Sequence, residues 1–184
     1  IILFLQILEH YVRKDLISNM AYSGITKSTT HFNTKLYSGN GGTQSITGVG
    51  FQPDFTWFKN TGGTDSHSMY DAVRGVTKQI EADTSGAETT ESTGLASFDS
   101  DGFTVGTRTA SNSNNMTIAS WNWKMGTTSG ISAGSQNITP SAYSINATAG
   151  MGIYKWSRTG ASTSDYFSHG LGATPVMAWQ KRTD

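Results

Sequence analysis

The chain has 184 residues, of which 14% are charged, and its 13 Lys and Arg balance its 13 Asp and Glu. This length can bury one hydrophobic core and part of another. The low, balanced charge argues against a nucleic-acid partner, which needs a basic surface, and the absence of Cys excludes a disulfide, a thiolate metal site and a thiol nucleophile.

Residues 1–31 form an N-terminal extension that differs from the rest of the chain in composition. The stretch "IILFLQILEHYVRKDLISN" is apolar and then charged, whereas Gly, Ser, Thr and Asn dominate from Met20 onward. Residues 1–19 are interpreted either as a segment that is not native or as an amphipathic helix that meets a partner helix. The apolar run of about eight residues is too short to span a bilayer, so no membrane insertion is expected.

Residues 32–126 are predicted to form one β-sandwich module. In "DFTWFKN", Phe55 and Trp57 alternate with Thr56 and Phe58, which is the period of a strand. "SHSMYDAVRGVTKQI" predicts two short strands on either side of Arg74–Gly75. Turn residues recur at a spacing of roughly 8–12 residues, which favours an all-β fold over a helical one.

Two further segments complete the predicted sandwich. Asp101-Gly102 predicts a hairpin turn between strands at Leu95–Phe98 and Phe103–Val105. The last strand, in "NNMTIASWNWKMG", alternates Met116, Ile118, Ser120 and Asn122 with Thr117, Ala119, Trp121 and Trp123. Large aromatic side chains are most often buried, so the core is predicted to contain Trp57, Trp121, Trp123 and Trp179.

The remainder is predicted to be a linker, residues 127–149, with a short strand at Ala142–Ile145, followed by the truncated start of a second similar repeat, residues 150–184. "GVGFQPDFTWFK" at 48–59 and "GLGATPVMAWQK" at 170–181 share five of twelve positions, namely Gly48 with Gly170, Gly50 with Gly172, Pro53 with Pro175, Trp57 with Trp179 and Lys59 with Lys181.

Few residues indicate chemistry. The four histidines, His10, His31, His67 and His169, lack zinc-site spacing. Asp99 and Asp101 weakly resemble part of a calcium loop, but a plain hairpin turn is preferred, so no cofactor is predicted and calcium is the alternative. Catalysis would need two facing carboxylates, for which the sequence offers only Glu81, Asp83, Glu88 and Glu91. Arg74 is expected to form a partly buried ion pair with Asp71 or Asp54.

The blocks "LYSGNGGTQSITGVGFQPDFTWFKN", "HSMYDAVRG", "GLASFDSDGFTVG" and "ASWNWKMG", in this order, resemble a β-sandwich module that recurs in tail fibres and other virion proteins of tailed phages, notably marine ones. The resemblance covers roughly residues 32–126 and 150–184. It implies a jelly-roll or concanavalin-like sandwich, arrayed in tandem on a virion appendage, and it carries over no catalytic residue.

The expected function is therefore a non-catalytic structural or receptor-binding module of an extracellular virion. Its expected partners are host-surface glycan or other virion proteins, and a homotrimer is expected by analogy with tail fibres. Two alternatives remain, a polysaccharide depolymerase or glycosidase on a sandwich fold and a bacterial extracellular carbohydrate-binding module. The candidate ligand-binding residues are the polar loop residues His67, Tyr70, Asn112, Asn114 and Asn115.

Overall fold

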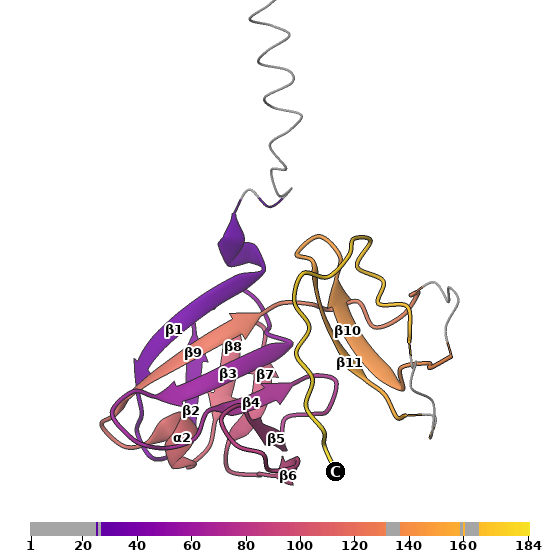
Figure 1. Ribbon diagram of the computed structural model, residues 1–184. Helices are drawn as coiled ribbons and strands as arrows, with labels where there is room; N and C mark the ends of the chain where they lie inside the picture. The colour runs from indigo at the N-terminus through magenta and orange to yellow at the C-terminus, as the bar shows by residue number, and fades with distance from the viewer. Residues whose placement is uncertain (1–24, 26, 132–136, 159, 161–165) are drawn as a thin grey trace, which may run out of the picture.

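A computed structural model describes residues 25, 27–131, 137–158, 160 and 166–184. The described chain is an all-β sandwich of two antiparallel sheets, next to a separate two-stranded hairpin (Figure 1). The predictions for residues 1–19 lie outside the described residues. Within the described part, no helix has both the length and the apolar character that crossing a bilayer requires.

The larger sheet has six strands, and the smaller has three. The order in the larger sheet is β1 (Phe32–Ser38), β9 (Thr117–Trp123), β3 (Phe55–Asn60), β4 (Ser68–Asp71), β5 (Lys78–Glu81) and β6 (Thr89–Thr90). The order in the smaller sheet is β2 (Gln44–Thr47), β8 (Gly102–Val105) and β7 (Leu95–Asp99). The described helices are two short turns, η1 (Ser28–Thr30) and α2 (Thr109–Asn112). The all-β sandwich, the strand pair around Arg74–Gly75 and the hairpin at Asp101-Gly102 are thus confirmed.

The hydrophobic core lies between the two sheets. The larger sheet contributes Phe58, Tyr70 and Ile118, and the smaller sheet faces them with residues that include Phe103 and Leu95. The Phe58 and Phe103 rings meet edge-on, with centroids 5.1 Å apart and planes at 77°. Edge-on pairs of this kind are favoured by the aromatic quadrupole, so the two sheets are joined by packed aromatic rings.

A side chain of the smaller sheet's hairpin fixes the loop that leads into β3. The carboxylate of Asp101 accepts hydrogen bonds from the backbone N–H groups of Gly48, at 2.9 Å, and Gly50, at 2.6 Å. Both glycines have positive φ, +78° and +90°, a region that L side chains rarely adopt. The G-x-G of the repeated motif therefore forms a backbone turn that wraps around a carboxylate.

The hairpin of β10 (Ala142–Asn146) and β11 (Met151–Lys155) contacts the sandwich through polar bonds. Asp54 accepts hydrogen bonds from the Met125 backbone N–H, at 2.8 Å, and from the Ser144 hydroxyl, at 3.2 Å. The short strand predicted within the linker is confirmed as β10. The predicted boundary between residues 149 and 150 falls in the turn that joins the two paired strands.

The C-terminal segment, residues 170–184, forms no strand and runs from this hairpin towards β5 and β6 (Figure 1). The Lys181 ammonium donates hydrogen bonds to the carbonyl oxygens of Glu81, at 3.0 Å, and Thr84, at 2.5 Å. The side chains of Val176, Met177 and Trp179 along this segment are exposed. The repeated sequence therefore has two structures, a central strand at Phe55–Asn60 and a segment without helix or strand at its second occurrence.

Candidate functional site

The tryptophans of β3 and β9 lie on the outer face of the larger sheet and not in the core, so the prediction that they are core residues is wrong. Along β9, Ile118, Ser120 and Asn122 are buried on the inner face, and the alternation of a strand turns Trp121 and Trp123 outward. Phe58 fills the inner side of β3 in the same way, which leaves Trp57 outside. Trp179 is also outside the core, since the residue is 53% exposed.

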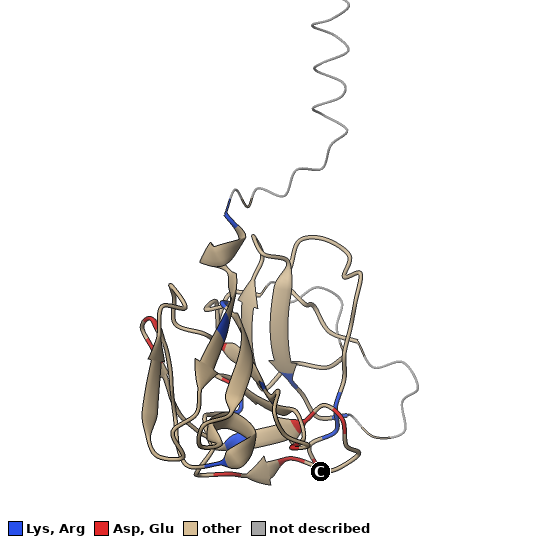
Figure 2. Cartoon of the chain, turned by 90° about the vertical axis from the view of Figure 1, so that its left-hand side faces the viewer, with Lys and Arg blue, Asp and Glu red and all other residues tan. Residues whose placement is uncertain are grey.

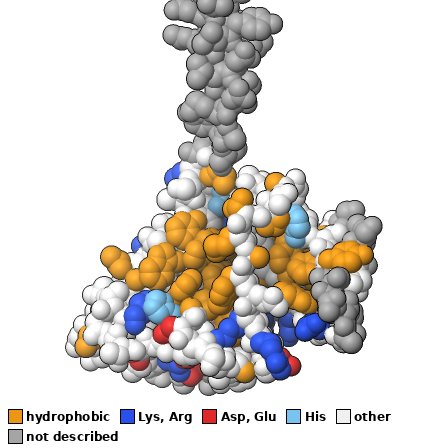
Figure 3. All heavy atoms as spheres, in the orientation of Figure 1, with side chains coloured by type: hydrophobic (Ala, Val, Ile, Leu, Met, Phe, Trp, Pro, Cys, Tyr) orange, Lys and Arg blue, Asp and Glu red, His pale blue; other side chains and the backbone are white. Residues whose placement is uncertain are grey.

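These outward side chains form what we call the aromatic face. Its members share the outer side of β1, β3 and β9 and the loop beside them, and they are Phe32, Phe55, Trp57, Trp121, Trp123 and His67. All six are half-buried. Figure 3 shows a broad apolar area over this part of the molecule.

The sheet register arranges the aromatic face in two rows. Trp123 of β9 lies between Phe32 and Phe55, with ring centroids 4.9 Å and 5.1 Å away. Trp57 and Trp121 face each other across β3 and β9 at 6.1 Å. All of these pairs are tilted or edge-on, with interplanar angles of 39° to 64°, so none of the rings covers its neighbour by parallel stacking. Part of each half-buried ring is therefore open to solvent.

His67 orients one ring of the face. The indole N–H of Trp57 donates to His67 Nδ1 at 2.8 Å, and the two rings stand at 72°. The backbone N–H of His67 donates in turn to the carboxylate of Asp83 at 3.0 Å. Of the predicted ligand-binding residues, His67 therefore belongs to the aromatic face.

A hollow of about 420 Å³ opens at one end of the aromatic face. It is lined by Ile25, Ser28, His31, Phe32, Trp123, Lys124, Ala149 and Met151. Phe32 and Trp123 belong to both the hollow and the face, so the two features form one continuous surface. The volume lies in the range of small-molecule sites, roughly 300–1,000 Å³.

Two of the predicted ligand-binding residues are interior, and their prediction as loop residues that face a ligand is wrong. Tyr70 is fully buried in the core, and its hydroxyl donates to Gln79 Oε1 at 3.0 Å. Burial raises the pKa of the Tyr70 hydroxyl well above its usual range. Asn112 is also fully buried, and its amide donates to the carbonyl oxygen of Gly106 at 2.8 Å and accepts from the Asn40 backbone N–H at 2.9 Å. Both residues hold the fold together.

Asn114 and Asn115 are exposed, as predicted for loop residues, in the connection between α2 and β9. Asn115 adopts a positive φ of 60°, and its backbone N–H donates to the Gly39 carbonyl oxygen at 2.9 Å. This connection precedes the first residue of β9, whereas Trp121 and Trp123 lie at the other end of the same strand. Their prediction as ligand-binding residues stays a prediction.

The oxygens of the weak calcium candidate are occupied by donors. Asp99 accepts from the hydroxyls of Ser97 and Thr104, both at 2.7 Å, and Asp101 accepts from the two glycine N–H groups described above. Among the described residues, no group of three or more His, Cys, Asp or Glu side chains is placed to hold a metal ion. In this structure the two carboxylates stabilise turns.

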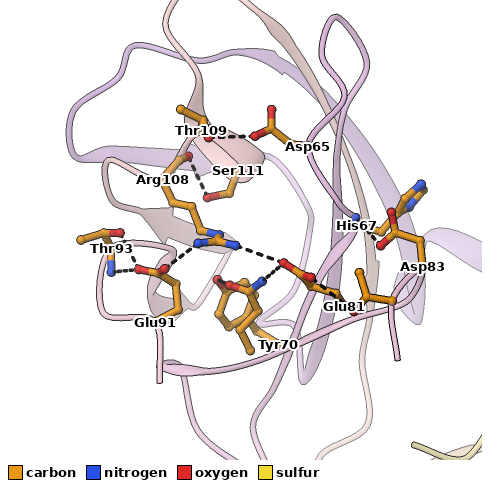
Figure 4. A network of polar contacts seen from close by, with 12 residues as sticks. Asp65, His67, Tyr70, Glu81, Asp83, Glu91, Thr93, Arg108, Thr109 and Ser111 are labelled. Carbon is orange, nitrogen blue, oxygen red and sulfur yellow. Dashed lines mark hydrogen bonds and ion pairs between the residues drawn. The ribbon is translucent and has the colours of Figure 1, made fainter. Parts of the chain in front are cut away.

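The carboxylates considered for catalysis are bound to cations or to N–H groups. Charged side chains gather at the end of the sandwich near the C-terminus (Figure 2). There Arg108 bridges Glu81, at 3.2 Å, and Glu91, at 2.6 Å (Figure 4). Hydrogen bonds from the Thr93 hydroxyl and backbone N–H, together with the Arg108 charge, hold the pKa of Glu91 below its usual range. This direction is opposite to the one that a general acid needs.

Arg74 forms the ion pair that was predicted. Its Nε lies 2.6 Å from Asp71 Oδ2, and its Nη1 lies 3.2 Å from Glu88 Oε2. The Arg74 and Asp71 side chains are 6% and 4% exposed, which makes this a nearly buried pair. The predicted ion pair is therefore confirmed, and of the two candidate partners Asp71 forms it, while Asp54 binds Met125 and Ser144.

Comparison with known protein families assigns the chain to a family. The family model described as "Domain of unknown function (DUF7483)" matches residues 27–184, which include both the sandwich and the hairpin. No curated protein and no solved structure matches the chain. Since the matched region covers most of the sequence, the chain belongs to the family described as domain of unknown function DUF7483.

Proposed function

We propose that this protein is a non-catalytic structural and receptor-binding module of a phage virion, of the tail-fibre kind, and that it binds host-surface glycan through its aromatic face. The resemblance of the ordered sequence blocks to those of virion modules supports the virion assignment. The observation that carries the glycan assignment is the position of Trp57, Trp121 and Trp123, which lie on the outer side of a rigid sheet and not in its core.

Half-exposed indole rings suit sugars for a physical reason. The face of an aromatic ring carries partial negative charge, which attracts the weakly positive C–H groups on one side of a pyranose ring. The rings of the aromatic face come from strands that pair residue by residue, so their positions are fixed before a ligand arrives. A preformed site loses little conformational entropy on binding.

The scarcity of charge supports a neutral ligand contact at the centre of the face. Lys59 is the cation of β3 that follows Trp57 on the outer side, and its ammonium donates to the backbone carbonyl oxygens of Gly63, at 3.3 Å, and Asp65, at 2.6 Å. Individual stacking contacts of this kind are weak. A trimer that presents several copies raises the overall strength by avidity.

A glycan array tests the proposal with two matched variants on the same face. Trp121→Ala removes an indole of the aromatic face, and Leu36→Ala truncates a residue of β1 that is 71% exposed. We expect the wild-type protein and Leu36→Ala to bind a common set of host-surface glycans, and Trp121→Ala to bind them about tenfold more weakly. Wild-type protein that binds no glycan on the array and no host cell would contradict the proposal and favour a spacer role.

A further inference from the structure

The hollow at the end of the aromatic face has a chemistry of its own. Its lining residues include Phe32 and Trp123, whose rings are tilted against each other, together with Ser28 of η1 and Ala149 of the turn between β10 and β11. No Asp or Glu is among its lining residues, whereas Lys124, His31 and Ser28 are.

Asn146 holds the parts of this hollow together. Its side-chain N–H₂ group contacts His31 Nδ1 at 2.9 Å and donates to the Lys124 carbonyl oxygen at 3.2 Å. Its side-chain oxygen accepts from the Ala149 backbone N–H at 2.9 Å. Because an amide nitrogen can only donate, His31 Nδ1 is the acceptor, and a neutral His31 ring then carries its proton on Nε2. His31, which is one of the lining residues, thereby has an N–H group of its own.

Lys124 is the Lys or Arg residue among those that line the hollow. Several other cations of the chain are engaged: Arg74 and Arg108 bind carboxylates, and Lys181 binds backbone carbonyl oxygens. The side chain of Lys124 is exposed and forms no ion pair with any residue that the structure describes. The nearby carboxylate of Asp54 already accepts hydrogen bonds from Met125 and Ser144.

We propose that this hollow binds the carboxylate-bearing sugar of an acidic glycan, a uronic or sialic acid, with the pyranose ring against Phe32 and Trp123 and the carboxylate at Lys124. The inference rests on the proposed glycan-binding function and adds its substrate class. Donors without a competing carboxylate complement an anion, and the aromatic walls complement the C–H side of the ring. Trp123 connects this subsite with the rest of the aromatic face, so the acidic sugar occupies one end of the bound chain.

The test compares glucuronic acid, N-acetylneuraminic acid and glucose in titrations followed by protein NMR. Three variants are used, namely Lys124→Gln, which removes the charge, Lys124→Arg, which keeps it, and Ala149→Trp, which fills the hollow. We expect the wild-type protein and Lys124→Arg to bind at least one acidic sugar more tightly than glucose. Lys124→Gln should lose about fivefold in affinity for that sugar, and Ala149→Trp should abolish binding. Binding of the acid should also weaken as salt is raised.

The outcomes separate this inference from the function on which it rests. Equal affinity for glucose and both acids, unchanged in Lys124→Gln, would overturn the acidic subsite, while glycan binding that is lost in Trp121→Ala would still support the aromatic face. A wild-type protein that binds no glycan would overturn both the acidic subsite and the proposed glycan-binding function. Circular dichroism spectra that match the wild type show that each variant is folded.

Discussion

The indole N–H of Trp57 donates to Nδ1 of His67 across 2.8 Å, and this bond joins a central strand of the larger sheet to the residue just before β4. The bond fixes the ring of Trp57 on the outside of the sandwich. It also explains why a polar residue lies beside an apolar face, since His67 supplies the acceptor that a half-buried indole needs.

Replacing His67 by Ala should therefore disturb the aromatic face more than the fold. We expect a loss of about 1 kcal/mol in the free energy of unfolding, the usual net value of one hydrogen bond, and a shifted indole N–H resonance for Trp57. Urea unfolding and NMR measure the two effects. An unshifted Trp57 resonance in His67→Ala would show that the bond does not orient the ring.

The core between the two sheets and the outer face of the larger sheet should respond differently to truncation. Phe103→Ala removes a fully buried ring that contacts both Tyr37 and Phe58, and we expect it to cost about 3–5 kcal/mol of stability. Phe32→Ala removes a half-buried ring of the aromatic face and should cost about 1 kcal/mol, in proportion to the smaller apolar area that it buries. Equal losses in urea unfolding would contradict the division into core and outer face.

Because the Arg74–Asp71 ion pair is nearly buried, replacing Arg74 should strongly lower the free energy of unfolding. Arg74→Met leaves the Asp71 carboxylate, which is 4% exposed, without its cation, and we expect a loss of about 3–5 kcal/mol. Arg182→Met breaks an exposed pair with Asp184 and should change stability by less than about 1 kcal/mol. Chemical denaturation of both variants provides the comparison, and equal effects would mean that the Arg74 pair is not buried.

The Asp101 turn predicts a specific dependence on pH. The N–H groups of Gly48 and then of Gly50 lower the pKa of Asp101, so the folded state binds the proton less readily than the unfolded state does. A lowered carboxyl pKa stabilises the fold above the unfolded value of about 3.9, and that stabilisation is lost as the pH falls through the folded pKa.

Asp101→Asn should therefore lower the Tm at pH 7 and have a smaller effect at pH 3. Asp184→Asn serves as the control. Asp184 is exposed, and its carboxylate accepts a hydrogen bond from the side chain of Arg182, which lies close by in the chain. A difference in Tm between wild type and Asp101→Asn that is the same at both pH values would contradict the role of the ionised carboxylate.

The sequence contains local information on most of the strands. Asp101-Gly102 predicts its hairpin because both residues suit the turn, and the scarcity of charge makes a buried partner for Arg74 predictable. Alternation also shows correctly that Trp121 and Trp123 share a face. It cannot show which of two apolar faces is the inner one, and here the inner face of β9 carries the smaller residues Ile118, Ser120 and Asn122.

The candidate site depended on contacts between distant parts of the chain. Asn112 lies in a polar loop sequence, yet it fills an interior position because Asn40 and Gly106 surround its amide. The hollow brings together residues of η1 with residues of β9 and the β10–β11 turn, which follow η1 in the chain by roughly a hundred residues. No local pattern marks such a site.

The most direct test of the central claim is to follow the indole N–H resonances of the five tryptophans while a bound glycan is titrated. The account predicts that the signals of Trp57, Trp121 and Trp123 shift with one common affinity, and that the exposed Trp179 does not shift with it. Binding that moves Trp179 alone, or that leaves all three sheet tryptophans unchanged, would contradict it.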